Sequence, residues 1–278
     1  MIVEFTLNGE AVAYDAAANE TLLMVLRRHG VFGVKHGCET GECGACLVLV
    51  DGTPMTSCVM LASQAAGRNV TTVEGVGGRQ ERGWRGSEPL HALQVAFIET
   101  GAIQCGYCTP GMILAAKALL EKTAHPTEAQ VREALAGVLC RCTGYVKPVE
   151  AVLRAAAVLR GESVPPIHPA QTVPPPEPLP ELGDKGEPLP SDRGEDGGGI
   201  GVRTRALPVM IVAPEVDTLQ QVGKPAPKVD ARKLVQGNPV FTDDIEHRGM
   251  LVGKLLLSPR AHALIKRIDA SRARALPG

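Results

Sequence analysis

The sequence predicts an α+β protein in which a β-grasp unit is followed by an all-α unit of four helices. Near the N-terminus apolar residues alternate with polar ones, as in half-buried strands, whereas from Glu88 to Arg160 they recur with helical spacing. A change of composition then marks a linker, since ten prolines lie between Gly161 and Ile200. We therefore expect four parts: residues 1–76, residues 85–161, a Pro- and Gly-rich linker at 162–221, and a partial C-terminal α/β segment at 222–278.

The first unit has the strand and turn patterns of two hairpins around one main helix. Asn8-Gly9 and Asp51-Gly52 are strong hairpin turns, and Asn19 is a candidate N-cap for the helix. The expected elements, in chain order, are a strand at Val3–Leu7, its partner at Ala11–Tyr14, a helix at Glu20–Arg28, strands at Leu47–Val50 and Pro54–Ser57, a short helix at Val59–Ala65 and a strand at Val70–Val73.

Residues 77–87 form a polar, glycine-rich connection to the helical unit. Four helices with short connections predict a compact bundle. Thr109 and Pro110 suit the N-cap and first position of one helix, and Thr127 with Gln130 has the spacing of a capping box. Pro148 is expected to open the last helix, which ends near Gly161.

Composition excludes several classes of function. The net charge is −1, from 29 basic and 30 acidic residues, and aromatic residues make up 3% of the chain, so a nucleic-acid surface is not expected. The N-terminus lacks the pattern of a signal peptide, and no run of about 18 apolar residues is present to span a bilayer. All eight cysteines lie between Cys38 and Cys142, which favours reduced, metal-binding thiols in a cytoplasmic protein over a secreted disulfide scaffold.

The first four cysteines have the spacing of a plant-type [2Fe–2S] site. Cys38, Cys43, Cys46 and Cys58 are spaced C-x4-C-x2-C-x11-C, and glycines between them permit a loop that wraps closely around a small anionic cluster. A structural zinc site, the alternative, usually has two symmetric C-x2-C pairs.

The remaining cysteines form a second quartet, spaced C-x2-C-x31-C-x-C: Cys105, Cys108, Cys140 and Cys142. Each pair lies between two expected helices. The C-x-C spacing is unusual for zinc, and a thioredoxin-type redox pair would not need the second pair. The spacing therefore favours a second cluster.

Together these motifs resemble one family. "GCETGECGAC", "IQCGYCTPGMIL" and "LCRCTGY" resemble the iron–sulfur portion of molybdenum hydroxylases of the xanthine dehydrogenase and aldehyde oxidase family, over residues 1–160. The resemblance implies a plant ferredoxin-like domain and a four-helix domain with one [2Fe–2S] cluster each. It also implies that Gln104 and Cys142 contact the molybdopterin cofactor at the domain edge. The stretch from Val222 looks like the start of the family's molybdenum-binding subunit, although Arg260 stands where many relatives carry His.

The resemblance implies electron transfer as the function. The chain would relay electrons from the molybdopterin site to an external acceptor during hydroxylation of an N-heterocycle, such as a purine, or of an aldehyde. The molybdenum catalytic residues would lie in a missing portion or a partner subunit, and no catalytic residue is assigned to this chain. The acceptor would be a separate flavin subunit or another carrier. The alternative is a non-catalytic iron–sulfur sensor or binding module that docks a partner. Lys35 and Arg141 could offset cluster charge, contact the phosphate of the cofactor or face solvent.

Overall fold

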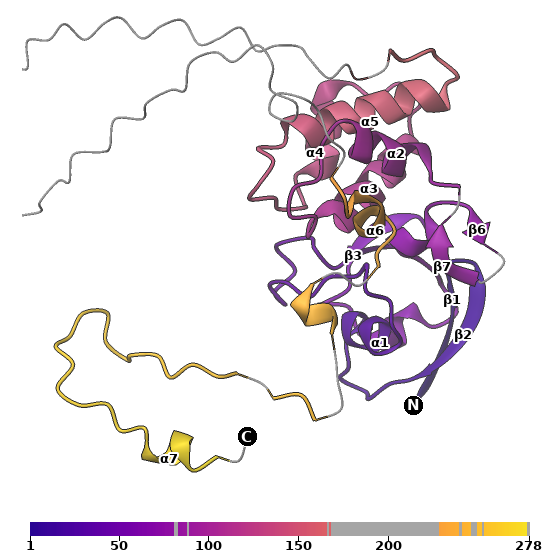
Figure 1. Ribbon diagram of the computed structural model, residues 1–278. Helices are drawn as coiled ribbons and strands as arrows, with labels where there is room; N and C mark the ends of the chain where they lie inside the picture. The colour runs from indigo at the N-terminus through magenta and orange to yellow at the C-terminus, as the bar shows by residue number, and fades with distance from the viewer. Residues whose placement is uncertain are drawn as a thin grey trace, which may run out of the picture.

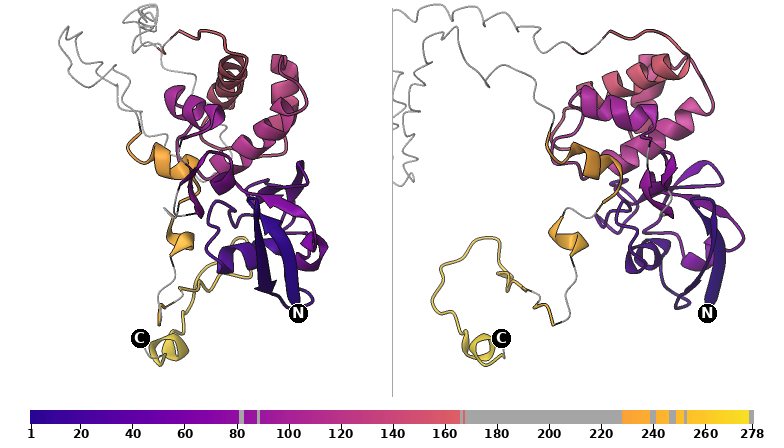
Figure 2. Two further views of the ribbon diagram at one scale, coloured as in Figure 1. Left: turned by 90° about the vertical axis from the view of Figure 1, so that its right-hand side faces the viewer. Right: turned by 45° about the vertical axis from the view of Figure 1, so that its right-hand side comes forward.

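A computed structural model describes residues 1–80, 83–87, 89–165, 167, 228–238, 241–245, 249–251 and 253–276. The strand-rich N-terminal unit packs directly against a helical unit, and a short segment from the C-terminal part lies along both (Figure 1). Figure 2 shows the same arrangement from two further sides. The α+β class is confirmed.

The N-terminal unit contains a five-stranded mixed sheet with the order β2-β1-β5-β3-β4. β1 pairs antiparallel with β2 and parallel with β5, while β3 pairs antiparallel with both β4 and β5. Both predicted hairpin turns form. The strands are β1 (Ile2–Leu7), β2 (Glu10–Asp15), β3 (Leu47–Val50), β4 (Thr53–Thr56) and β5 (Asn69–Thr71).

One helix, α1 (Leu22–Arg28), buries its apolar face against this sheet. The expected N-cap at Asn19 is wrong, because the Thr21 side chain accepts the N–H of Met24 and the helix begins after it. The expected helix near residues 59–65 is shorter, a 3-10 turn η1 at Ala62–Ala65, and a second turn, η2, covers Val73–Gly75.

The connection at residues 77–87 is not an irregular loop. It contains a two-stranded hairpin of β6 (Arg79–Gln80) and β7 (Gly83–Ser87). The sequence did not predict these short strands, because their polar, glycine-rich residues show no alternation of apolar and polar side chains.

The helical unit consists of α2 (Ala92–Glu99), α3 (Thr109–Leu120), α4 (Glu128–Leu135) and α5 (Val146–Leu159). The capping box of Thr127 and Gln130 at the start of α4 is confirmed. Cys108, rather than Thr109, occupies the N-cap of α3, and α5 begins at Val146, before Pro148. The apolar core of these helices continues across the junction to Leu47 and Leu49 of β3, so the two units share buried contacts.

The described part of residues 222–278 holds α6 (Ala231–Val235), the 3-10 turn η3 (Thr242–Asp244) and α7 (Ser271–Arg274), and no strand is assigned to it. α6 and η3 lie against the body of the protein, whereas the segment that carries α7 extends away from it (Figure 1). The short strand that the sequence suggests near residues 209–212 lies outside the described residues.

Candidate iron–sulfur centres

The first three cysteines of the N-terminal quartet lie in the loop between α1 and β3. The backbone N–H groups of Thr40 and Cys43 both point at the Cys38 sulfur, at 3.4 Å. Hydrogen bonds from the Thr40 side chain and from these N–H groups lower the pKa of the Cys38 thiol to about 5. This loop therefore favours a thiolate before any metal is bound.

Cys58 reaches the same loop from the end of β4. Ser57 fixes it there, because the Ser57 hydroxyl donates to the Cys46 carbonyl at 2.7 Å and the Ser57 N–H donates to the same oxygen at 3.3 Å. The thiols of Cys46 and Cys58 are both buried and interact with each other, and burial raises the pKa of Cys58 to about 11. The quartet is thus arranged as two pairs, Cys38 with Cys43 and Cys46 with Cys58.

The second quartet is held by the ends of four helices. Cys105 and Cys108 lie between α2 and α3, and Cys140 and Cys142 lie between α4 and α5. Here too the thiols interact in pairs, Cys105 with Cys142 and Cys108 with Cys140. Partial desolvation raises the pKa of Cys105, although it lies at the surface, and burial raises the pKa of Cys108.

Two polar side chains after α4 shape the C-x-C turn. The Tyr145 hydroxyl accepts the Cys140 N–H at 2.7 Å, and the Thr143 hydroxyl lies 3.1 Å from the Cys140 sulfur. Burial raises the pKa of Cys140, but hydrogen bonds from Thr143 and from the backbone outweigh it, so that the net shift is downward. Tyr145 reaches this position with a left-handed backbone, at φ 66°. Sequence reasoning missed Ser57 and Thr143, whose hydroxyls carry no spacing signal.

The two quartets face each other across one cavity of about 270 Å³. Its lining includes two thiols of the first quartet and all four of the second: Cys38, Cys43, Cys105, Cys108, Cys140 and Cys142. The Leu139 N–H donates to the Cys43 carbonyl at 2.9 Å, which joins the loop of the first quartet to the turn of the second. Gly44 makes this approach possible, since its φ is +68° and a Cβ atom there would meet the Gly137 carbonyl.

The donor sets fit two-iron clusters. A [2Fe–2S] cluster takes two thiolates on each iron, which matches the pairwise arrangement of the thiols in both quartets.

The residues expected at the molybdopterin edge lie at the surface. Gln104 and Cys142 are both exposed, as is the neighbouring Cys105, so this edge of the second quartet is accessible to a partner. Arg141 is exposed and lines the cavity between the quartets. The expectations for Lys35 are not met, because its side chain is 1% exposed and forms an ion pair with Asp244 instead of facing a cluster, a cofactor phosphate or solvent.

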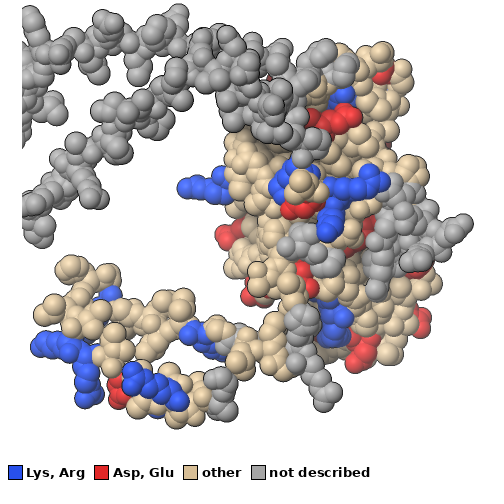
Figure 3. Space-filling view, viewed as in Figure 1, with Lys and Arg blue, Asp and Glu red and all other residues tan. Residues whose placement is uncertain are grey.

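The described helices include none that is both long and apolar enough to cross a membrane. On the face shown in Figure 3, acidic and basic side chains are interspersed over the body of the protein, with several Lys and Arg on the extended C-terminal segment.

Comparison with known sequence families gives three matches along the chain. Residues 5–70 match the 2Fe-2S iron-sulfur cluster binding domain, and residues 72–153 match the [2Fe-2S] binding domain. Residues 236–278 match the a/b hammerhead domain of aldehyde oxidase and xanthine dehydrogenase.

Individual proteins agree with these matches. The chain is 48% identical over 155 residues to the nicotinate dehydrogenase small FeS subunit of Eubacterium barkeri, which covers 55% of this chain and 93% of that protein. It is 44% identical over 153 residues to the xanthine dehydrogenase iron-sulfur-binding subunit of Escherichia coli O157:H7, covering 54% and 91%. The crystal structure of the aldehyde oxidoreductase from Desulfovibrio desulfuricans matches with a TM-score of 0.54 and 41% identity, over 59% of this chain and 18% of that one.

These relatives are parts of redox enzymes, so a purely sensory or binding role is not favoured. The two matched domains bring two [2Fe–2S] clusters, and the C-terminal match is the start of the molybdenum-binding region. The chain belongs to the xanthine dehydrogenase and aldehyde oxidase family of molybdenum hydroxylases and carries its iron–sulfur, electron-transferring portion.

Proposed function

We propose that all eight cysteines are cluster ligands. Residues 1–76 would form a plant ferredoxin-like β-grasp domain that holds one [2Fe–2S] cluster, and residues 85–161 a four-helix domain that holds the other. Residues 162–221 would be the linker to the molybdenum-binding domain, whose start is residues 222–278. The observation that carries this proposal is the pairwise contact of the thiols within each quartet, beside a cavity that thiols of both quartets line. The ligands are the first quartet, Cys38, Cys43, Cys46 and Cys58, and the second, Cys105, Cys108, Cys140 and Cys142.

When bound, the two clusters supply one-electron carriers between a two-electron catalytic site and an acceptor. The protein supplies their placement. Thr40 and the Cys43 N–H stabilise thiolate charge on Cys38, and Thr143 does so on Cys140. The Leu139–Cys43 hydrogen bond fixes the two loops relative to each other, which keeps the carriers at a constant separation.

The exposed edge at Gln104 and Cys142 is proposed to contact the molybdopterin cofactor of the molybdenum-binding domain or subunit, so that the cluster of the second quartet would accept electrons first. The cluster of the first quartet would then pass them to a flavin subunit or another acceptor. The substrate of the whole enzyme is proposed to be an N-heterocycle or an aldehyde, as the names of the relatives suggest. We infer a cytoplasmic enzyme from its reduced cysteines.

Iron analysis with paired variants tests the ligand assignment. Purified without oxygen, the full chain should contain about four iron and four sulfide per molecule, with two distinct EPR signals after reduction. Cys58→Ser should remove the first signal alone and Cys105→Ser the second alone, each with loss of about half the iron. Val59→Ser, at an exposed neighbour of Cys58, is the control and should keep all four. Stoichiometric zinc without sulfide, or full iron in both cysteine variants, would show that the assignment is wrong.

A further inference from the structure

Residues 228–238 and 241–245 lie across both iron–sulfur units, although residues 168–227 separate them in sequence from the body of the protein. We call these two stretches the strap. α6 contacts the helical unit, and η3 contacts the N-terminal unit through hydrogen bonds to Lys35 and Arg27, so the strap touches both sides of the junction (Figures 1 and 2).

The first half of the strap is part of the helical core. Leu234 and Val235 are at most 2% exposed and belong to the apolar cluster of α2 to α5. The Gln94 amide, itself fully buried, donates to the Val235 carbonyl at 2.8 Å. Leu234 lies directly over Gly106, where a Cβ atom would come within 2.6 Å of its Cδ1. This half therefore packs as a core element.

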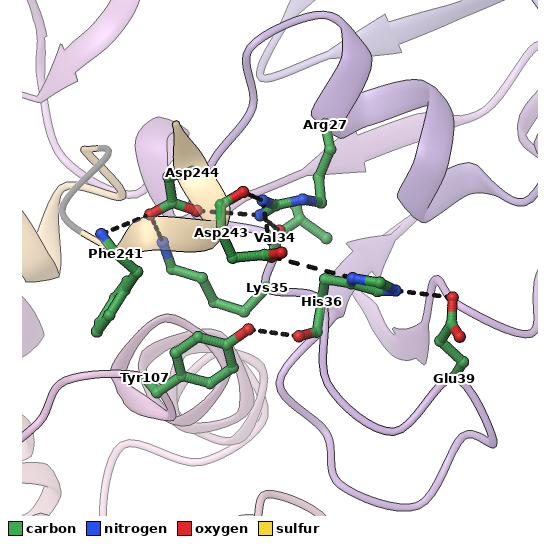
Figure 4. Close-up of polar contacts among 9 residues, drawn as sticks. All are labelled: Arg27, Val34, Lys35, His36, Glu39, Tyr107, Phe241, Asp243 and Asp244. Atoms are coloured by element: carbon green, nitrogen blue, oxygen red, sulfur yellow. Dashed lines mark hydrogen bonds and ion pairs between the residues drawn. The ribbon is translucent and has the colours of Figure 1, made fainter. Parts of the chain in front are cut away.

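The second half of the strap presents two carboxylates to two cations of the N-terminal unit (Figure 4). Asp244 accepts from Lys35 Nζ at 2.9 Å and from Arg27 Nη1 at 3.2 Å. Arg27 Nη2 also donates to the carboxylate of Asp243 at 3.0 Å and to its carbonyl at 2.7 Å. Lys35 and Asp244 have side chains at most 2% exposed, so this ion pair is buried.

An aromatic contact closes the site on its other side. The Phe241 ring lies 4.7 Å from Lys35 Nζ and packs edge-on against Tyr107, with 5.0 Å between ring centroids. The Tyr107 hydroxyl in turn donates to the His36 carbonyl in the loop of the first quartet. Lys35 is thus enclosed by the N-terminal unit, the helical unit and the strap.

The buried charge indicates what this surface must bind. A buried ammonium group needs an opposite charge, and desolvation lowers the pKa of Lys35 even with Asp244 beside it. The surface around Arg27 and Lys35 is therefore complementary to an acidic segment with an adjacent aromatic ring. The Phe241–Asp244 stretch of the strap has this chemistry.

We propose that Arg27, Lys35, Tyr107 and the α2–α3 surface form a receptor for the strap of the same chain. The receptor would hold the start of the hammerhead match on the iron–sulfur portion by non-covalent contacts, whether or not the linker is intact. This inference goes beyond the proposed electron-transfer function and does not depend on the ligand assignment.

Cleavage of the linker in the assembled protein tests the proposal. A protease recognition sequence is inserted near residue 190 of the full chain, which is purified with its clusters, cut, and passed over a gel-filtration column. The strap fragment should co-elute with the iron–sulfur portion as one heterodimer of unit stoichiometry. Separation of the two pieces of the otherwise unchanged protein would overturn the proposal. A doubled mass, with straps exchanged between two copies, would overturn the arrangement within one chain.

Variants identify the ion pair as the anchor. Asp244→Asn should speed dissociation of the cut strap by about a hundredfold or more, because Lys35 loses its counter-charge and one amide N–H must face a cation. The change lies in the strap, so the iron content and circular dichroism of the body should be unchanged. The double variant Lys35→Met with Asp244→Leu should restore retention, since an apolar pair can replace a buried ion pair. Glu121→Gln, which breaks the exposed Lys117–Glu121 pair, is the control and should have no effect. Equal retention in Asp244→Asn and the control would refute the receptor.

Discussion

Replacing Gly44 with alanine should weaken the junction between the two cysteine loops. Gly44 has a φ of +68°, and its added Cβ would meet the Gly137 carbonyl and lie 2.8 Å from Val138 Cα. The left-handed backbone costs an L-residue about 1 kcal/mol. Forcing the Gly137–Leu139 turn outward costs about another 1 kcal/mol for overpacking and about 1 kcal/mol for the Leu139–Cys43 hydrogen bond. We therefore expect Gly44→Ala to lower the free energy of unfolding by about 3 kcal/mol.

Gly52 provides a matched control for this prediction. Its φ is +78°, but a Cβ atom there would have nothing within 4 Å, so Gly52→Ala carries only the backbone cost of about 1 kcal/mol. Both variants would be unfolded in urea with full iron content, followed by circular dichroism and by cluster absorbance. The magnetic interaction between the two reduced clusters should also weaken in Gly44→Ala alone. If the two variants lose the same stability, the close approach at Gly44 does not hold the loops together.

Three further predictions concern single groups. Burial raises the pKa of Glu74, whose carboxylate accepts the Gly33 N–H at 2.7 Å. The native state therefore holds the proton more tightly than the unfolded chain does. The free energy of unfolding should then fall as the pH rises from the unfolded pKa of about 4.3 through the raised native value. In urea titrations, Glu74→Gln should therefore be more stable than the unchanged protein above that pH window and equally stable below it. A difference in the free energy of unfolding that does not change with pH would contradict this. Thr143→Val removes a hydroxyl 3.1 Å from the Cys140 sulfur. A lost hydrogen bond of about 0.5–1 kcal/mol should lower the reduction potential of the second cluster by roughly 20–40 mV. A redox titration with no shift in the signal of that cluster would count against the contact. Thr127→Ala removes the cap of α4 and should cost about 1 kcal/mol, visible as faster amide exchange in the first turn of α4 and not in α5.

Features with local causes could be predicted from the sequence. Asn8-Gly9 and Asp51-Gly52 form hairpin turns because these residues tolerate positive φ, and all four have it. Thr127 and Gln130 satisfy each other's backbone within one turn, so their capping box depends on nothing distant. The short cysteine spacings, C-x4-C-x2-C, C-x2-C and C-x-C, are local in the same sense, because each loop presents these thiols within a few residues, whereas Cys58 and the joining of the two later pairs depend on the fold.

Features that depend on distant groups could not be predicted. Lys35 and Asp244 are 209 residues apart, and neither lies in a pattern that indicates the other. Lys35 was expected to offset cluster charge, contact a cofactor phosphate or face solvent because it lies near Cys38, but the partner that buries it comes from beyond the linker. The N-cap at Thr21 was missed for a related reason. Thr21 forms a β-bridge with Leu61, so a tertiary contact selects the start of α1 over the local preference at Asn19.

What each cofactor site can hold depends on local residues, whereas the relative position of the two sites depends on distant ones. The cysteines determine what each loop can hold, but the two quartets lie on different apolar cores, since Cys46 and Cys58 belong to one cluster and Cys108 to the other. Electron transfer requires a fixed separation, so something other than the ligands must set it. Among the described residues, the contacts that cross the junction near the loops include Leu139 to Cys43, Tyr107 to His36, and the strap across Lys35. None of them involves a thiol. A protein with all eight cysteines but altered junction contacts should therefore still bind iron, yet lose the defined geometry between its clusters.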